Sequence, residues 1–214
     1  MSMAGTVVKR AMTALSPRHV VVRGSERHAR VALTFDDGPH AENTPRILDA
    51  LEAAQARATF FIQGSQAAKL PHLVRRIHAG GHEVANHAAT HRAPAELGTH
   101  AYVREVLDTQ VLLSDIVGAP VGHSFRPPYG AVTLMTFSRL CHAGFRFVFW
   151  SRDSRDSWLR DPASLADHFS TQQMRAGDIV LFHDDYAHTA QALPGLLAAL
   201  GRQGLQAVAV KGLS

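Results

Sequence analysis

From Arg30 to the end of the chain, short apolar runs alternate with stretches in which apolar residues recur at helical spacing. An alternation of strand and helix predicts an α/β fold with a parallel sheet, because each parallel connection has to cross back over the sheet. Seven such units could close into a barrel one unit short of the usual eight, or remain an open, doubly wound sheet. The predicted strands are Val31–Phe35, Ala58–Ile62, Glu83–Ala85, Ser124–Arg126, Phe145–Trp150, Ile179–His183 and Gln206–Val210.

The composition is that of one globular domain. The chain has 214 residues, 46% of them hydrophobic and 19% charged, which is enough for a sizeable core. We expect the domain to span residues 30–214 and residues 1–29 to form an N-terminal extension. The net charge is only +4, and the basic residues are scattered, so a nucleic-acid-binding surface is not expected. The single cysteine, Cys141, excludes an internal disulfide and a zinc site built from several cysteines.

The N-terminal segment does not have the pattern of a secretory signal peptide. A basic pair, Lys9-Arg10, is followed by Ala11–Leu15, which is too short for the apolar core of a signal and is interrupted by Ser16-Pro17-Arg18. No segment has the length of a membrane span. We therefore expect a cytoplasmic protein, free or peripheral to the inner membrane. The oligomeric state is left open.

Polar residues follow the predicted strands at the points where the strands end. Since the carboxyl ends of parallel strands meet at one edge of the sheet, these side chains are expected to converge on one site, as on the rim of a barrel. This regularity favours the barrel over the open sheet. The residues are Asp36 and Asp37 after the first strand, His87 and His91 after the third, Arg126 after the fourth, Asp153 after the fifth and His183 at the end of the sixth.

Adjacent carboxylates such as Asp36 and Asp37 each need a partner when they are held away from water. His87 and His91 are four residues apart, so on one helical turn both imidazoles could bind one metal ion. A third protein ligand would leave a position open for water, and one of the two aspartates could supply it. Arg126 is placed by strand order to balance the other.

Two further segments carry candidate residues. Pro127 and Pro128 follow Arg126 and should rigidify a turn that presents the Tyr129 N–H. In the sixth strand, Leu181 and His183 lie on the same side. An aspartate behind the His183 imidazole would orient it and raise its pKa, as suits a general acid; Asp153 and Asp156 are both candidates.

Five segments, in order, resemble the motifs of the NodB-like polysaccharide deacetylases, carbohydrate esterase family 4: TFDDGP, HAATH, RPPYG, DSRDSW and IVLFH. The resemblance runs from about Arg30 to the C-terminus. It implies a distorted (β/α)₇ barrel and a divalent metal ion, usually Zn²⁺, with Co²⁺, Ni²⁺ or Mn²⁺ as alternatives. It also implies hydrolysis of N-acetyl, or sometimes O-acetyl, groups on an acetylated glycan.

The resemblance also assigns roles to individual residues. Asp37, His87 and His91 would bind the metal, Asp36 would be the general base held by Arg126, and His183 would be the general acid tuned by Asp153. The Tyr129 N–H would stabilise the oxyanion, and Leu181 and Trp158 would line the acetyl pocket.

Two positions depart from the family pattern. Ala88 stands where a Ser or Thr normally helps to fix the metal-binding loop, which should loosen that loop, and Ser157 intervenes between Asp156 and Trp158.

The sequence therefore predicts a metal-dependent hydrolase that removes N-acetyl groups from amino sugars of a poly- or oligosaccharide. Metal and base would activate water, and the acid would protonate the leaving amine. Two alternatives stay open: a deformylase or small-amide hydrolase on the same barrel, and a catalytically silent carbohydrate-binding protein. The glycan, the sugar position and the native metal are not specified by the sequence.

Overall fold

The sheet is a curled parallel sheet of nine strands in the computed structural model of the protein, which describes residues 16–171 and 173–213. The strands are β1 (Val20–Val21), β2 (Arg30–Asp36), β3 (Thr59–Ile62), β4 (Glu83–Asn86), β5 (Ser124–Phe125), β6 (Arg146–Val148), β7 (Arg152–Asp153), β8 (Ile179–His183) and β9 (Gln206–Val208). Their order is β1-β6-β5-β4-β3-β2-β8-β7, with β9 beside β2. The expectation that the chain has no secretory signal peptide rests largely on residues 1–15, which lie outside the described residues.

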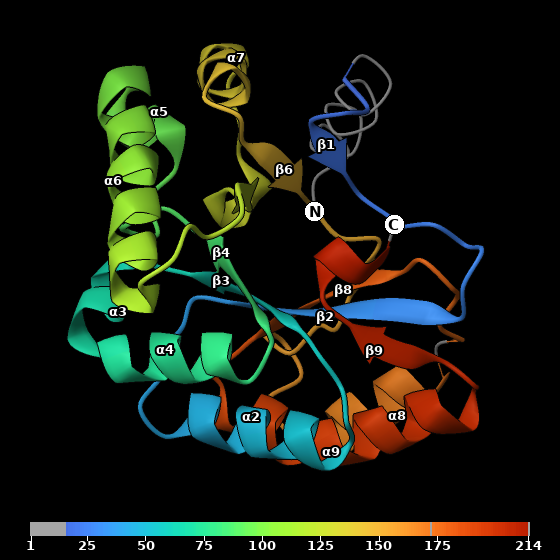
Figure 1. Cartoon of the computed structure of the whole chain (residues 1–214). Helices are drawn as coiled ribbons and strands as arrows, with labels where there is room; N and C mark the ends of the chain where they lie inside the picture. The colour runs from blue at the N-terminus through green and yellow to red at the C-terminus, as the bar shows by residue number, and fades with distance from the viewer. Residues whose placement is uncertain (1–15, 172, 214) are drawn as a thin grey trace.

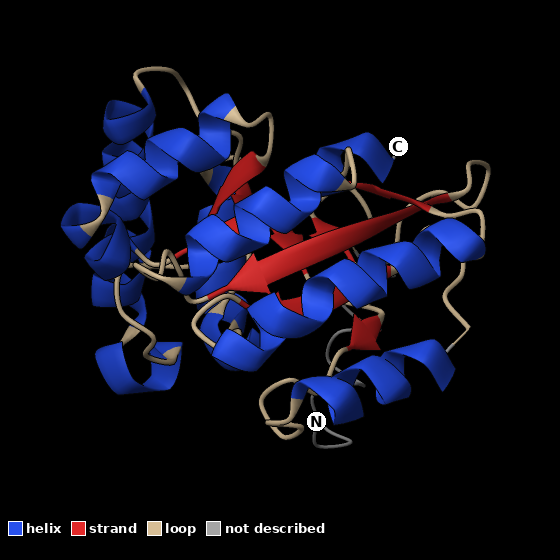
Figure 2. Ribbon diagram, turned by 90° about the horizontal axis from the view of Figure 1, so that it is seen from below, coloured by secondary structure: helices blue, strands red, loops and turns tan. Residues whose placement is uncertain are grey.

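Helices connect the strands and lie on the outside of the curled sheet (Figures 1 and 2). The α-helices are α2 (Asn43–Ala53), α3 (Gly64–Lys69), α4 (Pro71–Ala79), α5 (Pro94–Leu97), α6 (Thr99–Val117), α7 (Leu134–His142), α8 (Pro162–Thr171) and α9 (Ala187–Arg202). Two short 3₁₀ helices, η1 (Pro128–Gly130) and η2 (Val210–Leu213), complete the described elements. No helix in the described part of the chain is long and apolar enough to cross a membrane.

Each of the seven predicted strands overlaps an observed strand, and the predicted single α/β domain is confirmed. The curled sheet is a half-barrel, because its path runs from β1 at one end to β7 at the other. These two end strands were not predicted: each has two residues, which is too short to show a hydrophobic pattern. β1 pairs with β6, so part of the segment expected to be an extension joins the sheet.

The centre of the sheet is formed by β2, which pairs with β3, β8 and β9. Its side chains are buried on both faces, as expected for a parallel strand covered by helices. Phe35 stacks against Phe60 of β3 and Phe182 of β8, with ring centroids 5.1 and 5.6 Å apart. This packing fixes the register in which Asp36 lies opposite His183 at the ends of β2 and β8.

Candidate active site

Most of the residues predicted for the site meet in one cavity at the carboxyl ends of the strands. The cavity has a volume of about 360 Å³. Of the ten predicted residues, all but Arg126 and Trp158 line it: Asp36, Asp37, His87, His91, Tyr129, Asp153, Leu181 and His183. A second cavity of about 400 Å³ adjoins it and shares Asp37 and His91. The polar residues that follow separate strands thus do converge.

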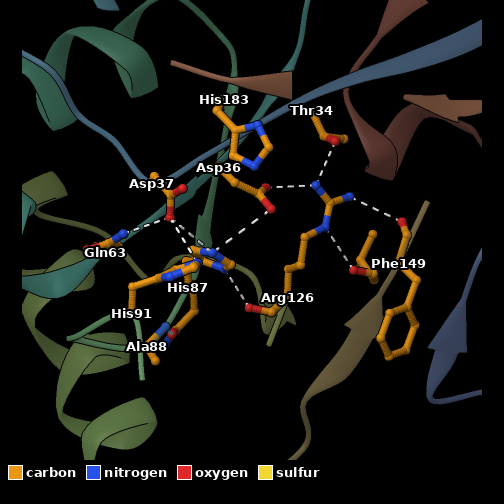
Figure 3. Close-up of polar contacts among 12 residues, drawn as sticks. Thr34, Asp36, Asp37, Gln63, His87, Ala88, His91, Arg126, Phe149 and His183 are labelled. Atoms are coloured by element: carbon orange, nitrogen blue, oxygen red, sulfur yellow. Dashed lines mark hydrogen bonds and ion pairs between the residues drawn. The ribbon is translucent and has the colours of Figure 1, made fainter. Parts of the chain in front are cut away.

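Asp36 is balanced by Arg126, as the strand order predicted. Arg126 is fully buried and donates from Nη1 to Asp36 Oδ1 at 2.7 Å and to Thr34 Oγ1 at 2.7 Å (Figure 3). The same guanidinium donates to the carbonyl oxygens of Val148 and Phe149, at 3.0 and 3.1 Å. With its donors bound to fixed acceptors, Arg126 holds the Asp36 carboxylate in one orientation.

Asp37, His87 and His91 form a three-residue cluster with the composition of a metal site. One ligand atom from each lies within 4.8 Å of the others. His87 Nε2 and His91 Nε2 are 3.4 and 3.3 Å from Asp37 Oδ1. Figure 3 marks these contacts with dashed lines. Gln63, at the end of β3, donates from Nε2 to the same Asp37 oxygen at 2.7 Å. Asp37 has a φ of 78°, which turns its side chain away from the strand direction followed by Asp36.

The environment of His87 fits a cation ligand. Its Nδ1 lies 2.7 Å from the carbonyl oxygen of Arg126, and because a carbonyl only accepts, Nδ1 carries a hydrogen. Its Nε2 is buried without a hydrogen-bond partner among the described residues, although it faces the carboxylates. Burying a polar nitrogen without a partner costs free energy, unless a bound ligand such as a metal ion supplies the missing contact. Two imidazoles and a carboxylate are donors that suit Zn²⁺ and leave a coordination position open.

The charges around the cluster affect each protonation state. Burial raises the pKa of the Asp37 carboxyl, but contact with His87 outweighs it, and the pKa lies well below its usual range. Burial lowers the pKa of His87, but the charges of Asp36 and Asp37 outweigh it and raise the pKa overall. Burial lowers the pKa of His91 and favours its neutral, ligating form. A cation therefore has to displace a proton from His87, so metal affinity should decrease as the pH falls.

The carboxylate behind His183 is Asp156, not Asp153. His183 Nδ1 lies 2.8 Å from Asp156 Oδ1, and the His183 backbone N–H donates to Asp156 Oδ2 at 2.7 Å. Thr189 Oγ1 donates to the second oxygen at 2.9 Å. The prediction that Asp153 tunes His183 is wrong, because Asp153 is exposed and accepts a hydrogen bond from the Arg155 N–H instead.

Asp156 changes the acidity of His183. Burial lowers the pKa of the imidazole, but the hydrogen bond and the charge of Asp156 outweigh burial and raise the pKa to about 9. Because Nδ1 faces Asp156, the Nε2 atom is left to face the cavity that His183 lines. His183 is therefore protonated at neutral pH and placed to donate a proton.

The prediction that Trp158 lines the acetyl pocket is also wrong. Its side chain is 82% exposed, and Trp158 is absent from the cavity wall. Ser157, the residue before it, is in the wall instead, together with Trp150 and Leu181. Residues 156–158 lie in a turn closed by a hydrogen bond from the Trp158 N–H to the Arg155 carbonyl oxygen, and this turn brings Ser157, not the indole, to the cavity.

Other residues of the site were not predicted from the sequence. Gln63 and Trp150 both lie at or just beyond strand ends, so the rule that found the aspartates and histidines could have found them too. Tyr186 lines the same cavity, and its ring centroid is 5.5 Å from that of His183. It follows β8 in a run of polar residues, in which nothing in the sequence distinguished it as a site residue.

Tyr129 was predicted as a site residue, and its ring packs against that of His91, with the ring centroids 4.3 Å apart.

The comparison with protein families agrees with the fold and the site. Residues 23–148 match the family described as polysaccharide deacetylase. The chain belongs to this family, carbohydrate esterase family 4, and the predicted enzyme class is confirmed with it. The set of Asp37, His87 and His91 corresponds to the metal site typical of the family.

Curated relatives are deacetylases of amino-sugar polymers. A peptidoglycan-N-acetylglucosamine deacetylase of Bacillus cereus is 35% identical over 188 residues, covering 86% of this chain and 87% of its own. A chitooligosaccharide deacetylase of Bradyrhizobium is 35% identical over 190 residues, covering 82% of this chain and 86% of its own. Some relatives are longer: the chain spans 39% of the length of a Listeria monocytogenes peptidoglycan-N-acetylglucosamine deacetylase that is 34% identical to it.

The fold is that of solved family members. The crystal structure of a peptidoglycan N-acetylglucosamine deacetylase superposes with a TM-score of 0.86 at 28% identity, covering 94% of this chain and 95% of that one. The predicted NodB-like barrel is thus confirmed, as a curled half-barrel of the family type.

Proposed function

We propose that the protein hydrolyses the N-acetyl groups of N-acetylglucosamine residues in peptidoglycan or chitooligosaccharides, with Zn²⁺ as its metal ion. The observation that carries this proposal is the convergence of three metal ligands, a held carboxylate and a protonated imidazole on one cavity. The relatives that match most of the chain act on such glycans, to judge from their names. A binding role alone would need neither a base nor an acid.

Asp37, His87 and His91 would hold the ion. When bound, the ion supplies a Lewis acid that lowers the pKa of a water molecule and polarises an amide carbonyl. The cluster fits that role because the unpartnered His87 Nε2 and the Asp37 carboxylate face each other.

The remaining steps fall to the residues around the ion. Asp36, oriented by Arg126, takes a proton from the attacking water as its oxygen bonds to the carbonyl carbon. The Tyr129 backbone N–H is the proposed donor to the oxygen that gains negative charge. His183 then gives its Nε2 proton to the amide nitrogen as the carbon–nitrogen bond breaks. The carbon–nitrogen bond breaks to give a free amino sugar and acetic acid, which ionises to acetate. Asp36 then releases its proton to solvent and His183 takes one up from solvent, which restores both residues.

Product analysis tests the proposal. Purified protein loaded with Zn²⁺ is incubated with defined N-acetylglucosamine oligosaccharides and with peptidoglycan, and acetate, formate and free amine are measured separately. Equal amounts of acetate and amine, lost on treatment with a chelator and restored by Zn²⁺, are expected. Formate without acetate would favour the deformylase alternative. Binding of the oligosaccharides with no product would favour the silent carbohydrate-binding protein.

A further inference from the structure

The loop that joins the two metal-binding histidines, residues 88–90, is held on both sides by other elements. Its first residue, Ala88, has a strained backbone with a φ of 61°. The Ala88 side chain is fully buried in a cluster that includes Tyr102, Val106 and Phe125. This position therefore has no hydroxyl with which to hold the loop, and the polar backbone groups of the loop need partners from elsewhere.

The carbonyl groups of the loop are bound by the start of α3. The Gly64 N–H donates to the Ala88 carbonyl oxygen at 2.9 Å, and the Ser65 N–H donates to that of Ala89 at 3.0 Å. Gly64 allows this close approach, because a Cβ there would lie 2.7 Å from Thr109 Oγ1 and 3.2 Å from the Ala89 Cα. One side of the loop is thus fixed to the beginning of α3.

The donor groups of the loop bind mainly to one carboxylate. Glu105 Oε1, from α6, accepts a hydrogen bond from the Ala89 N–H at 3.0 Å and another from Thr90 Oγ1 at 2.7 Å. The Thr90 N–H also donates to the same oxygen. The Ala88 N–H is bound separately, by Asn86 Oδ1 at 2.9 Å. A single oxygen of Glu105 therefore accepts three donors from the segment between His87 and His91.

We propose that Glu105 is the positioning residue of the metal site, holding the loop so that both imidazoles present Nε2 to the same point beside Asp37. The hydrogen bonds of the loop to the charged Glu105 carboxylate, which is carried by the helix α6, restrict the loop before any ion binds. The loop therefore loses less conformational entropy when the ion binds. This inference rests on the proposed function in one respect, that the cluster binds a metal ion. Glu105 lies outside the walls of both cavities beside the cluster, so its effect on the reaction would be exerted through the loop.

Zinc titration of matched variants tests the proposal. Glu105→Ala should lower the affinity for Zn²⁺ by about 10–100-fold, the loss typical when a residue that supports a ligand is removed. Glu105→Gln keeps a carbonyl oxygen in place of Oε1 but no charge, so its loss should be smaller. Asp108→Ala is the control, because it removes an exposed carboxylate from the same helix and should bind Zn²⁺ as the wild type does. Equal affinity in Glu105→Ala and Asp108→Ala would overturn the proposal.

Amide hydrogen exchange in metal-free protein gives a readout that is independent of the ion. The Ala89 and Thr90 amides should exchange about tenfold faster or more in Glu105→Ala, since hydrogen bonds to a charged acceptor are lost. Unchanged exchange would overturn the proposal even if activity fell. If Glu105→Ala does not fold, Glu105→Gln and Thr90→Val decide, and unaltered exchange and zinc affinity in both would overturn it. A wild-type protein that binds no Zn²⁺ would instead refute the proposed metal-dependent function, while the exchange rates would still decide the role of Glu105.

Discussion

Two sides of the site are constructed differently. The proton-transfer side, named for the roles proposed above, consists of Asp36 and His183, which end adjacent strands and are paired in register. Each has a buried opposite charge in contact with it, Arg126 for Asp36 and Asp156 for His183. Both ion pairs are largely buried, and each joins the end of a central strand to a neighbouring segment.

The metal side consists of Asp37, His87 and His91, which follow strand ends and lie on connecting loops. Asp37 has a left-handed backbone, and His91 is partly exposed. Support comes from hydrogen bonds of Gln63 and Glu105 to the ligands and their loop. The two sides should therefore lose function separately: changes on the metal side should reduce occupancy by the ion, and changes on the proton-transfer side should reduce the rate at full occupancy.

Asp37→Ala should have the largest effect. It removes one of three protein ligands, so zinc affinity should fall by more than about 100-fold, the largest loss expected from a merely supporting residue. Activity should fall together with metal content, measured by elemental analysis of the same samples. A variant that keeps both its zinc and its turnover would remove Asp37 from the metal side.

Asp36→Asn should separate the two sides most clearly. The amide keeps nearly the same shape and can still accept a hydrogen bond from Arg126, but it cannot take the proton of the attacking water. Turnover should fall by about 10²–10⁴-fold, the range for a lost general base, while zinc stays bound. Loss of zinc here, with retention in Asp37→Ala, would reverse the roles of the two neighbours.

Asp156→Asn should move the pH profile. As the proposed general acid, His183 is active only when protonated, so kcat/KM should be highest below its pKa of about 9 and decline as the pH rises through that value. Without the Asp156 charge, burial lowers the pKa, and the alkaline limb should move down by about 1–2 pH units. Asp153→Asn should leave the limb in place, since Asp153 does not contact His183. An unmoved limb in Asp156→Asn would show that another group is the acid.

Gln63→Leu should have the smallest effect. It removes the amide that donates to Asp37 Oδ1 and leaves all three ligands in place. Zinc affinity should fall by about tenfold, the lower end of the range for a supporting residue, and turnover at saturating zinc should change little. Calorimetric titration and rates at high zinc measure the two quantities. A large loss of turnover at saturating zinc would place Gln63 in contact with substrate.

The sequence was sufficient to place the residues whose positions depend on the strands and their ends. Asp36, His87 and Arg126 were placed correctly because a parallel sheet brings its carboxyl ends to one edge. The partner of His183 could not be assigned, because Asp156 reaches it through a turn in which Arg155 has a φ of 61°. A positive φ is uncommon for arginine, and nothing in the sequence indicates it.

The expectation that Ala88 loosens the metal-binding loop also depended on local information. Many of the bonds that hold the loop come from Glu105, on a helix that begins several residues beyond His91, and others come from the start of α3. No periodicity or spacing connects a glutamate in the middle of α6 with two histidines that precede the helix. Contacts between elements that are separate in the sequence, and single turns of unusual backbone, are the parts of the site that required the structure.

The positions of the two indole rings allow intrinsic tryptophan fluorescence to report on ligand binding in this enzyme. The chain has two tryptophans, Trp150 in the cavity wall and Trp158 on the surface beside it. A sugar that enters the cavity would displace water from Trp150, and the emission of an indole responds to the polarity around it. Trp158→Phe would leave one emitter inside the site. In the Asp36→Asn background, where substrate persists, its fluorescence would follow glycan binding without any label.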